Sequence, residues 1–153
     1  FFLLNTSSPI FGELISEVNS AMHEVIPKLK IIAEDNDDNI SYRLCRMDFD
    51  IDARWKWCET IHNFYWHDAT TTLGTSLGEA YHLLNSSLSR RNSGFLQEHA
   101  NHASIIILLL GTTPHGNGKN NLYFFKKKNR WFQVSIKIAI EMDLDNDPHP
   151  YFH

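Results

Sequence analysis

An uninterrupted aliphatic run at residues 105–110, with the sequence Ile-Ile-Ile-Leu-Leu-Leu, most constrains the fold of this chain. A strand with one face in water alternates apolar and polar residues, whereas a parallel strand buried on both faces is apolar throughout. The run is also far shorter than the roughly 20 apolar residues of a membrane-spanning helix. We therefore predict that Ala103 to Leu110 form a central, parallel strand covered on both faces.

The first ten residues form a second segment of this type. Phe1 to Leu4 are apolar and predict a strand buried on both faces, while Asn5 to Pro9 predict a turn that caps a helix. From Ser8 to Glu34, apolar residues recur at a spacing of three and four, as on one face of an amphipathic helix. Because ligands of open α/β folds bind beyond the carboxyl ends of such strands, we look for a site in this turn first.

The middle of the chain predicts an antiparallel hairpin. Ser41 to Phe49 and Arg54 to Tyr65 read as strands joined by a two-residue turn centred on Ile51 and Asp52. That turn pairs positions whose numbers sum to 103, which sets Cys45 opposite Cys58. Two cysteines do not make a disulfide framework, so we expect reduced thiols and a cytoplasmic setting.

The remaining elements complete an α/β pattern. A helix is predicted to follow residues 74–80 and to end near Arg90, another spans Leu122 to Phe132, and a strand spans Val134 to Met142. With 153 residues, of which 42% are apolar and 21% charged, the chain has the size and composition of one globular domain. We predict a doubly wound, Rossmann-like three-layer sandwich with a mostly parallel central sheet and one antiparallel strand from the hairpin.

Three loops resemble one known family. Residues 1–9 read as an apolar run followed by Asn-Thr-Ser-Ser-Pro, close to the family pattern of an apolar run and Asp-x-Ser-x-Ser. Residues 74–80, Gly-Thr-Ser-Leu-Gly-Glu-Ala, resemble the family signature Gly-Thr-x-Leu-Gly-x-Ala, and residues 110–114 stand where the family has Thr-Asp-Gly-x-Pro. These segments are similar to those of von Willebrand factor type A (VWA) domains, which implies the VWA fold across residues 1–153.

In that family, the three loops form a metal-ion-dependent adhesion site (MIDAS), where Asp, two Ser, Thr and a second Asp hold a divalent cation. Asn5 stands at the position of the first Asp, Pro9 at that of the second Ser and Gly111 at that of the second Asp. Ser7 and Thr75 keep the family chemistry and are the weak metal candidates. Since Mg²⁺ prefers carboxylate oxygens, the resemblance implies a degenerate MIDAS without a bound metal or other cofactor, and it disfavours Mg²⁺.

The end of the chain adds two expectations. Residues 129–140 resemble the corresponding segment of bacterial tellurium-resistance-type VWA proteins. A full VWA domain continues through another helix, strand and helix, whereas this sequence stops at His153. We therefore expect an excerpt of a longer protein that lacks the C-terminal elements of the family.

The resemblance implies a non-enzymatic adaptor or scaffold module that binds a protein partner, in a bacterial stress or tellurium-resistance-type system. No nucleophile stands beside a base, because Ser7 lacks a Gly-x-Ser-x-Gly elbow and both cysteines lie in predicted strands. The net charge of −4 gives no electrostatic reason to expect nucleic acid or an anionic membrane as a partner. Basic residues are scattered apart from the run at 126–128.

An alternative from another class keeps a metal and rebuilds its site. His67, Asp68 or His115 would replace the lost acidic residues from loops near the same face. Imidazole ligands favour zinc or another transition metal over Mg²⁺. The alternative is thus a metal-dependent ligand-binding domain, although each of these residues reads more simply as a surface loop residue.

Overall fold

The computed structural model describes residues 1–6, 12–35, 41–72, 74, 76–90, 94–96, 104–110 and 127–141. Within these ranges the chain forms one five-stranded sheet with the strand order β3-β2-β1-β4-β5. The strands are β1 (Phe2–Asn5), β2 (Arg43–Phe49), β3 (Ala53–Thr60), β4 (Ile105–Leu110) and β5 (Ile136–Glu141), and the helices are α1 (Gly12–Asp35), α2 (Leu77–Ser87) and α4 (Arg130–Val134). The predicted α/β class is confirmed.

The sheet is mostly parallel, as predicted. β1 lies at its centre and pairs in parallel with β2 on one side and with β4 on the other, and β4 pairs in parallel with β5. The β2–β3 hairpin supplies the antiparallel pair at one edge. A parallel pair needs a crossover connection, and α1 lies between β1 and β2 in the chain while α2 lies between β3 and β4. The predicted central position of the 105–110 strand is therefore correct.

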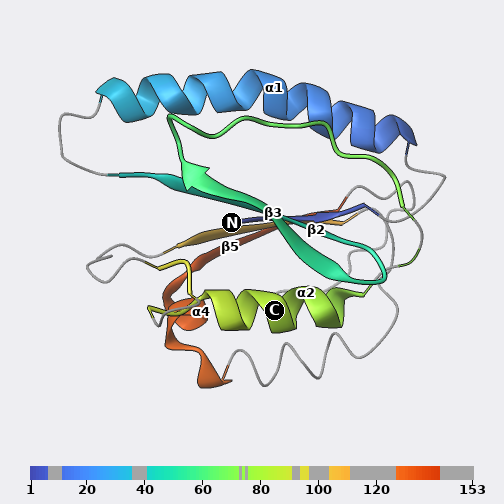
Figure 1. Cartoon of the computed structure of the whole chain (residues 1–153), viewed down its shortest axis with the longest axis vertical. Helices are drawn as coiled ribbons and strands as arrows, with labels where there is room; N and C mark the ends of the chain where they lie inside the picture. The colour runs from blue at the N-terminus through green and yellow to red at the C-terminus, as the bar shows by residue number, and fades with distance from the viewer. Residues whose placement is uncertain are drawn as a thin grey trace.

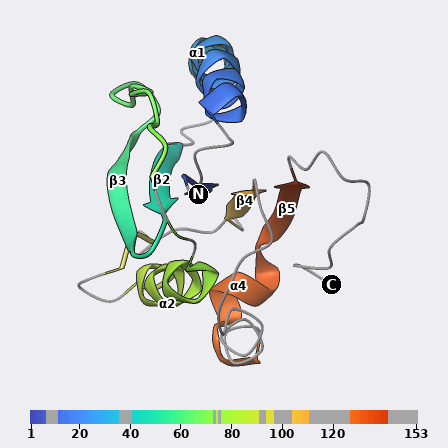
Figure 2. The same ribbon diagram turned by 90° about the vertical axis from the view of Figure 1, so that its right-hand side faces the viewer.

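Helices cover both faces of the sheet: α1 lies over one face, and α2 and α4 lie over the other (Figures 1 and 2). Alternation along β1 explains why this strand is apolar throughout. Leu3 packs in the cluster that contains α2, whereas Phe2 and Leu4 pack in the cluster that contains α1. The core is thus two apolar clusters separated by the sheet.

The predicted 8–34 helix is close to the observed one, because α1 contains Pro27 and continues to Asp35. One predicted strand boundary is wrong. β3 ends at Thr60, so residues 61–65 do not extend the strand. Of the predicted 122–132 helix, only residues 127–132 are described, and α4 begins within this part, at Arg130. Among the described residues, no helix is long and apolar enough to cross a membrane.

A β-bulge divides the hairpin into two registers. Near the turn, Phe49 pairs with Ala53 and Met47 with Trp55, whereas Arg46 pairs with Trp57. The loop therefore has three residues rather than the predicted two, and Lys56 is the extra residue that restores the predicted pairing farther out. Residues two apart normally share a face, but a bulge breaks this alternation. As a result, Trp55 packs in the α2 cluster and Trp57 in the α1 cluster.

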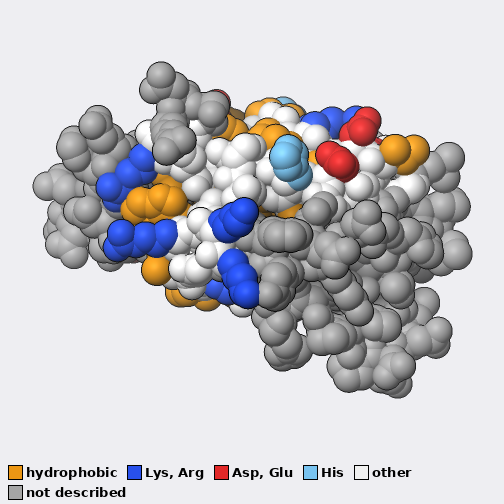
Figure 3. Space-filling model, turned by 90° about the horizontal axis from the view of Figure 1, so that it is seen from below, with side chains coloured by type: hydrophobic (Ala, Val, Ile, Leu, Met, Phe, Trp, Pro, Cys, Tyr) orange, Lys and Arg blue, Asp and Glu red, His pale blue; other side chains and the backbone are white. Residues whose placement is uncertain are grey.

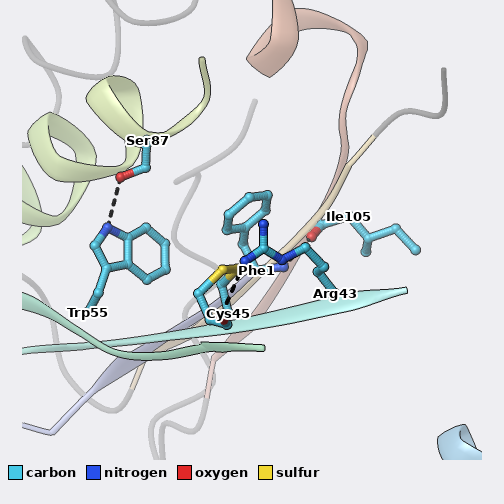
Figure 4. Close-up of a disulfide and its surroundings, with 7 residues drawn as sticks. Phe1, Arg43, Cys45, Trp55, Ser87 and Ile105 are labelled. Atoms are coloured by element: carbon cyan, nitrogen blue, oxygen red, sulfur yellow. Dashed lines mark hydrogen bonds between the residues drawn. A yellow bond between two sulfur atoms is a disulfide. The ribbon is translucent and has the colours of Figure 1, made fainter. Parts of the chain in front are cut away.

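The restored register sets Cys45 opposite Cys58, as predicted, but the expected reduced state is wrong. The two sulfurs form a disulfide. Figure 4 shows the bridge on the side of the hairpin from which Trp55 reaches α2, where the Trp55 indole Nε1 donates to the Ser87 hydroxyl at 2.8 Å. The cytoplasmic setting was argued from reduced thiols, so it loses that support and stays a prediction.

We predict that reduction of the Cys45–Cys58 bond lowers the free energy of unfolding. The bond closes a loop with a sequence separation of 13 residues, for which chain entropy gives about 3 kcal/mol. Thermal melts with and without dithiothreitol measure the effect, and the Cys45→Ala/Cys58→Ala variant should not respond to the reductant. Two thiols titrating in denatured, unreduced protein would contradict the disulfide.

Candidate functional site

The strand order reverses at β1, between the side that carries β2 and the side that carries β4. In open α/β sheets, the crevice outside the carboxyl ends of the strands at such a reversal is the usual ligand site. Asn5 ends β1 at this edge and is only 3% exposed, and Asp50 directly follows β2 and is 7% exposed. We call the end of the sheet at which β1, β2 and β4 finish the carboxyl edge, and it is the candidate site.

Thr6 and Thr72 close part of this edge with mutual hydrogen bonds. The Thr72 backbone N–H donates to the Thr6 carbonyl at 2.7 Å, and the two hydroxyl oxygens lie 3.0 Å apart. The Thr6 backbone N–H also donates to the Phe49 carbonyl at 3.1 Å. These contacts tie the end of β1 to the end of β2 and to the segment before α2, with neutral groups.

Asp50 is the acidic residue of this edge. Its carboxylate accepts from the Arg54 guanidinium at 2.7 Å and from the Asp52 backbone N–H at 3.0 Å. Burial opposes ionisation of Asp50, but the Asp52 N–H, the Thr72 hydroxyl and the Arg54 charge outweigh it and hold the pKa of this carboxyl below its usual value. The carboxylate is thus ionised at neutral pH and already has donors.

The structure describes one of the predicted MIDAS positions. Asn5 lies at the carboxyl end of a central strand, as the resemblance implies. Ser7, Pro9, Thr75 and Gly111 lie outside the described residues, so their convergence on Asn5 stays a prediction. In the described ranges, no group of three or more His, Cys, Asp or Glu side chains could hold a metal ion.

Sequence reasoning missed Asp50 and Thr72. Asp50 comes directly after a strand that pairs with β1, so the rule that selected Asn5 also selects Asp50. Thr72 carried no such signal, because residues 61–72 have no regular secondary structure that would place it against Thr6.

Gly74 and Ser76 join this edge to α2. The Ser76 backbone N–H donates to the Asp50 carbonyl, and the Ser76 hydroxyl caps α2 by accepting from the Glu79 N–H at 3.4 Å. Gly74 has a φ of +85°, and a Cβ at this position would lie 2.3 Å from Ile51 Cγ1 in the hairpin turn. The glycine therefore lets the loop approach the hairpin turn.

The structure describes two of the three residues of the alternative metal site, and each contacts a different neighbour. The His67 ring stacks on Trp57 with centroids 4.5 Å apart, while Asp68 pairs with His23 of α1, with 2.6 Å between Oδ1 and Nε2. His115 lies outside the described residues. His23 and Asp68 line an open groove of about 360 Å³ between α1 and residues 68–71. His23 is thus a candidate partner of Asp68 that sequence reasoning missed.

A buried arginine holds this side of the molecule together. Arg46 is 1% exposed, and its Nε and Nη2 donate to the two carboxylate oxygens of Asp48 at 2.7 and 2.9 Å. Its guanidinium carbon lies 4.2 Å from the centroid of the Trp66 ring and 5.4 Å from that of Trp57. Arg46 Nη1 also donates to the His67 carbonyl. A bidentate pair, a carbonyl and two rings thus stabilise the buried cation.

We predict that Gly74→Ala destabilises the domain by about 1–3 kcal/mol, because alanine is strained at positive φ and its methyl group meets Ile51. Chemical denaturation measures the loss. In an Ile51→Ala background the collision is absent, so the same substitution should cost less there and report the φ strain alone. An unchanged midpoint for Gly74→Ala in the parent would contradict the described loop.

We predict that Arg46→Met costs about 3–5 kcal/mol, because it leaves the Asp48 carboxylate buried without its cation. The double variant Arg46→Met/Asp48→Leu should lose much less than the sum of the single changes, since no unpaired charge remains. Urea denaturation of the four proteins gives the coupling. Lys28→Met, which breaks an exposed pair with Glu24, is the control and should unfold near the parent. Additive losses at 46 and 48 would show that the pair is not coupled.

Comparisons of the chain with models of known protein families, with curated proteins and with solved structures gave no match. The VWA resemblance therefore rests on residues 1–9, 74–80 and 110–114 of the sequence.

Proposed function

We propose that the chain is a non-enzymatic VWA-type module that binds a protein partner through the carboxyl edge of its sheet and carries a degenerate MIDAS. The observation that carries the proposal is the chemistry at the end of β1, where a buried Asn5 occupies the first acidic position of the family pattern. An amide lacks the charge with which a carboxylate binds Mg²⁺. The tellurium-resistance-type assignment and a cytoplasmic setting belong to the same proposal.

The topology supports this proposal at the level of the fold. β1 is central, the order reverses beside it, and the antiparallel β3 lies at the edge next to β2. With α1 over one face and α2 over the other, we propose the doubly wound, Rossmann-like three-layer sandwich that the sequence predicts. In this arrangement β1, β2 and β4 end at the carboxyl edge, and α2 begins there.

The chemistry of Asp50 supports a binding role over an enzymatic one. A general base must have a free oxygen or nitrogen that accepts a proton from the substrate, and its pKa must lie near the working pH. Asp50 instead has a lowered pKa, and Arg54 and Asp52 already donate to its carboxylate. Such a fixed carboxylate is suited to shaping a loop surface for a partner.

The second candidate is the metal-dependent ligand-binding domain. One observation favours it, with His23 added to the candidate ligands: His23 Nε2 and Asp68 Oδ1 lie 2.6 Å apart at an open groove. Imidazole and carboxylate are both zinc ligands, and the site would draw further ligands from His67, His115 or water. Zinc that raises the melting temperature of the parent but not of His23→Ala would favour this candidate, and His62→Ala is the control at another exposed histidine.

We predict that Asn5→Asp with Pro9→Ser and Gly111→Asp restores Mg²⁺ binding. The two new carboxylates should repel each other and lower the melting temperature without metal, and Mg²⁺ should raise it again because the ion binds the folded state. Thermal melts of parent and variant with and without MgCl₂ measure both effects.

The control adds the same charge elsewhere: Asn63→Asp with Ser86→Asp, at two exposed positions. It should melt near the parent and ignore Mg²⁺. A metal-dependent rise confined to the triple variant supports the degenerate MIDAS. No rise in that variant would mean that the loops do not converge, and micromolar Mg²⁺ binding by the parent would contradict the degeneracy.

A further inference from the structure

Lys127 and Lys128, from the basic run at residues 126–128, lie on the same surface as the end of α2. Asn129, which follows Lys127 and Lys128, caps α4 by accepting from the Phe132 N–H at 3.1 Å. Its side-chain amide donates to the Asn85 side-chain oxygen at 2.9 Å and to the Leu88 carbonyl at 3.3 Å. One asparagine thus fixes the start of α4 against the C-terminal end of α2.

This contact brings cations from two segments together. Arg90 follows α2, and its guanidinium carbon lies 4.4 Å from the centroid of the Trp131 ring in α4. Arg90, Lys127, Lys128 and Arg130 are all exposed. Beside them lies an apolar element, since Val134 is 51% exposed and Trp131 is partly exposed. We call these six residues the basic–apolar patch.

The local charge of this surface is opposite to that of the whole chain. Residues 80–90 and 127–140 contain five Lys or Arg and no Asp or Glu, although the net charge of the chain is −4. The fifth cation, Lys137, turns inward and donates to the Phe132 and Ser135 carbonyls at 2.9 and 2.7 Å. Figure 3 shows most Lys and Arg side chains of this face toward one end, around hydrophobic side chains, with the acidic side chains toward the other end.

The patch lies at the opposite end of the molecule from the carboxyl edge. α2 begins beside Asp50, where Ser76 donates to the Asp50 carbonyl, and ends before Arg90. α4 precedes β5, whose first residue pairs with Ile105 at the start of β4. The patch therefore lies at the amino edge of the sheet, and an inference drawn from it does not depend on the proposed MIDAS.

We propose that the basic–apolar patch docks a short acidic peptide segment that carries an apolar side chain. Exposed guanidinium and ammonium groups pair with carboxylates, and Arg does so in a bidentate manner. Val134 and the partly exposed Trp131 ring offer contact area for an apolar side chain between those carboxylates. A net charge of −4 opposes the approach of a long polyanion, so a peptide of few charges fits this surface better than a nucleic acid.

The test is fluorescence anisotropy with a labelled peptide of Asp and Glu that contains a central Leu-Trp pair. Binding should weaken as the salt concentration rises from about 0.05 to about 0.2 M, as screening requires. Lys127→Glu with Arg130→Glu should weaken binding by about tenfold or more. The same peptide with Ser-Ser in place of Leu-Trp should bind more weakly to the parent.

Lys28→Glu with Lys56→Glu is the matched control, because it changes the net charge equally at exposed positions away from the patch. It should bind the peptide nearly as the parent does, and circular dichroism melts check that both variants fold. An equal loss in both variants, or no binding by the parent, would overturn the proposal. Tighter binding of single-stranded DNA or of phosphatidylserine vesicles than of the peptide would assign the patch to that partner instead and overturn it as well.

Discussion

The packing on the α1 side of the sheet depends on the contacts of one buried group, the Arg46 guanidinium. Residues 61–72 have no helix or strand of their own, yet Phe64, Trp66 and Ala69 in this segment belong to the core. Their placement requires partners from elsewhere. Arg46 binds the His67 carbonyl and lies against the Trp66 ring, and Asn19 of α1 binds both the Trp66 indole and the Ala69 backbone. Side chains from β2 and α1 thus supply the hydrogen bonds that a strand would have supplied.

That segment in turn fixes the candidate site, because Thr72 is its last residue and pairs with Thr6. The bulge at Lys56 in β3 contributes to the packing on both faces of the sheet. It turns Trp57 toward α1, where its ring is the second one near the Arg46 guanidinium. It turns Trp55 toward α2, where the indole N–H donates to the Ser87 hydroxyl. A regular strand would have placed both indoles on one face. One inserted residue therefore stabilises both sides of the sheet.

The sequence predicts what local pattern determines and fails where distant contacts decide. Apolar runs located β1 and β4 and their central places in the sheet, and the turn residues located the hairpin. The bulge at Lys56 has no glycine or proline to announce it. Ile61 and Phe64 look like a continued strand, and only Arg46 and Asn19, far away in sequence, explain why the chain leaves the sheet. The pairing of Cys45 with Cys58 followed from register, but the oxidation state depends on surroundings that spacing does not encode.

The two ends of the sheet differ in a way that bears on function. At the carboxyl edge, Thr6, Thr72 and Asp50 bond to neighbours within the domain, so their polarity shapes a surface and leaves little capacity for a cation. At the amino edge, the four cations Arg90, Lys127, Lys128 and Arg130 are exposed, and so is Val134. A domain with −4 net charge that gathers cations at one end has a directional field, which orients an acidic partner before contact. Because α2 runs between the two edges, a partner at one end contacts the helix whose other end is capped at the candidate site.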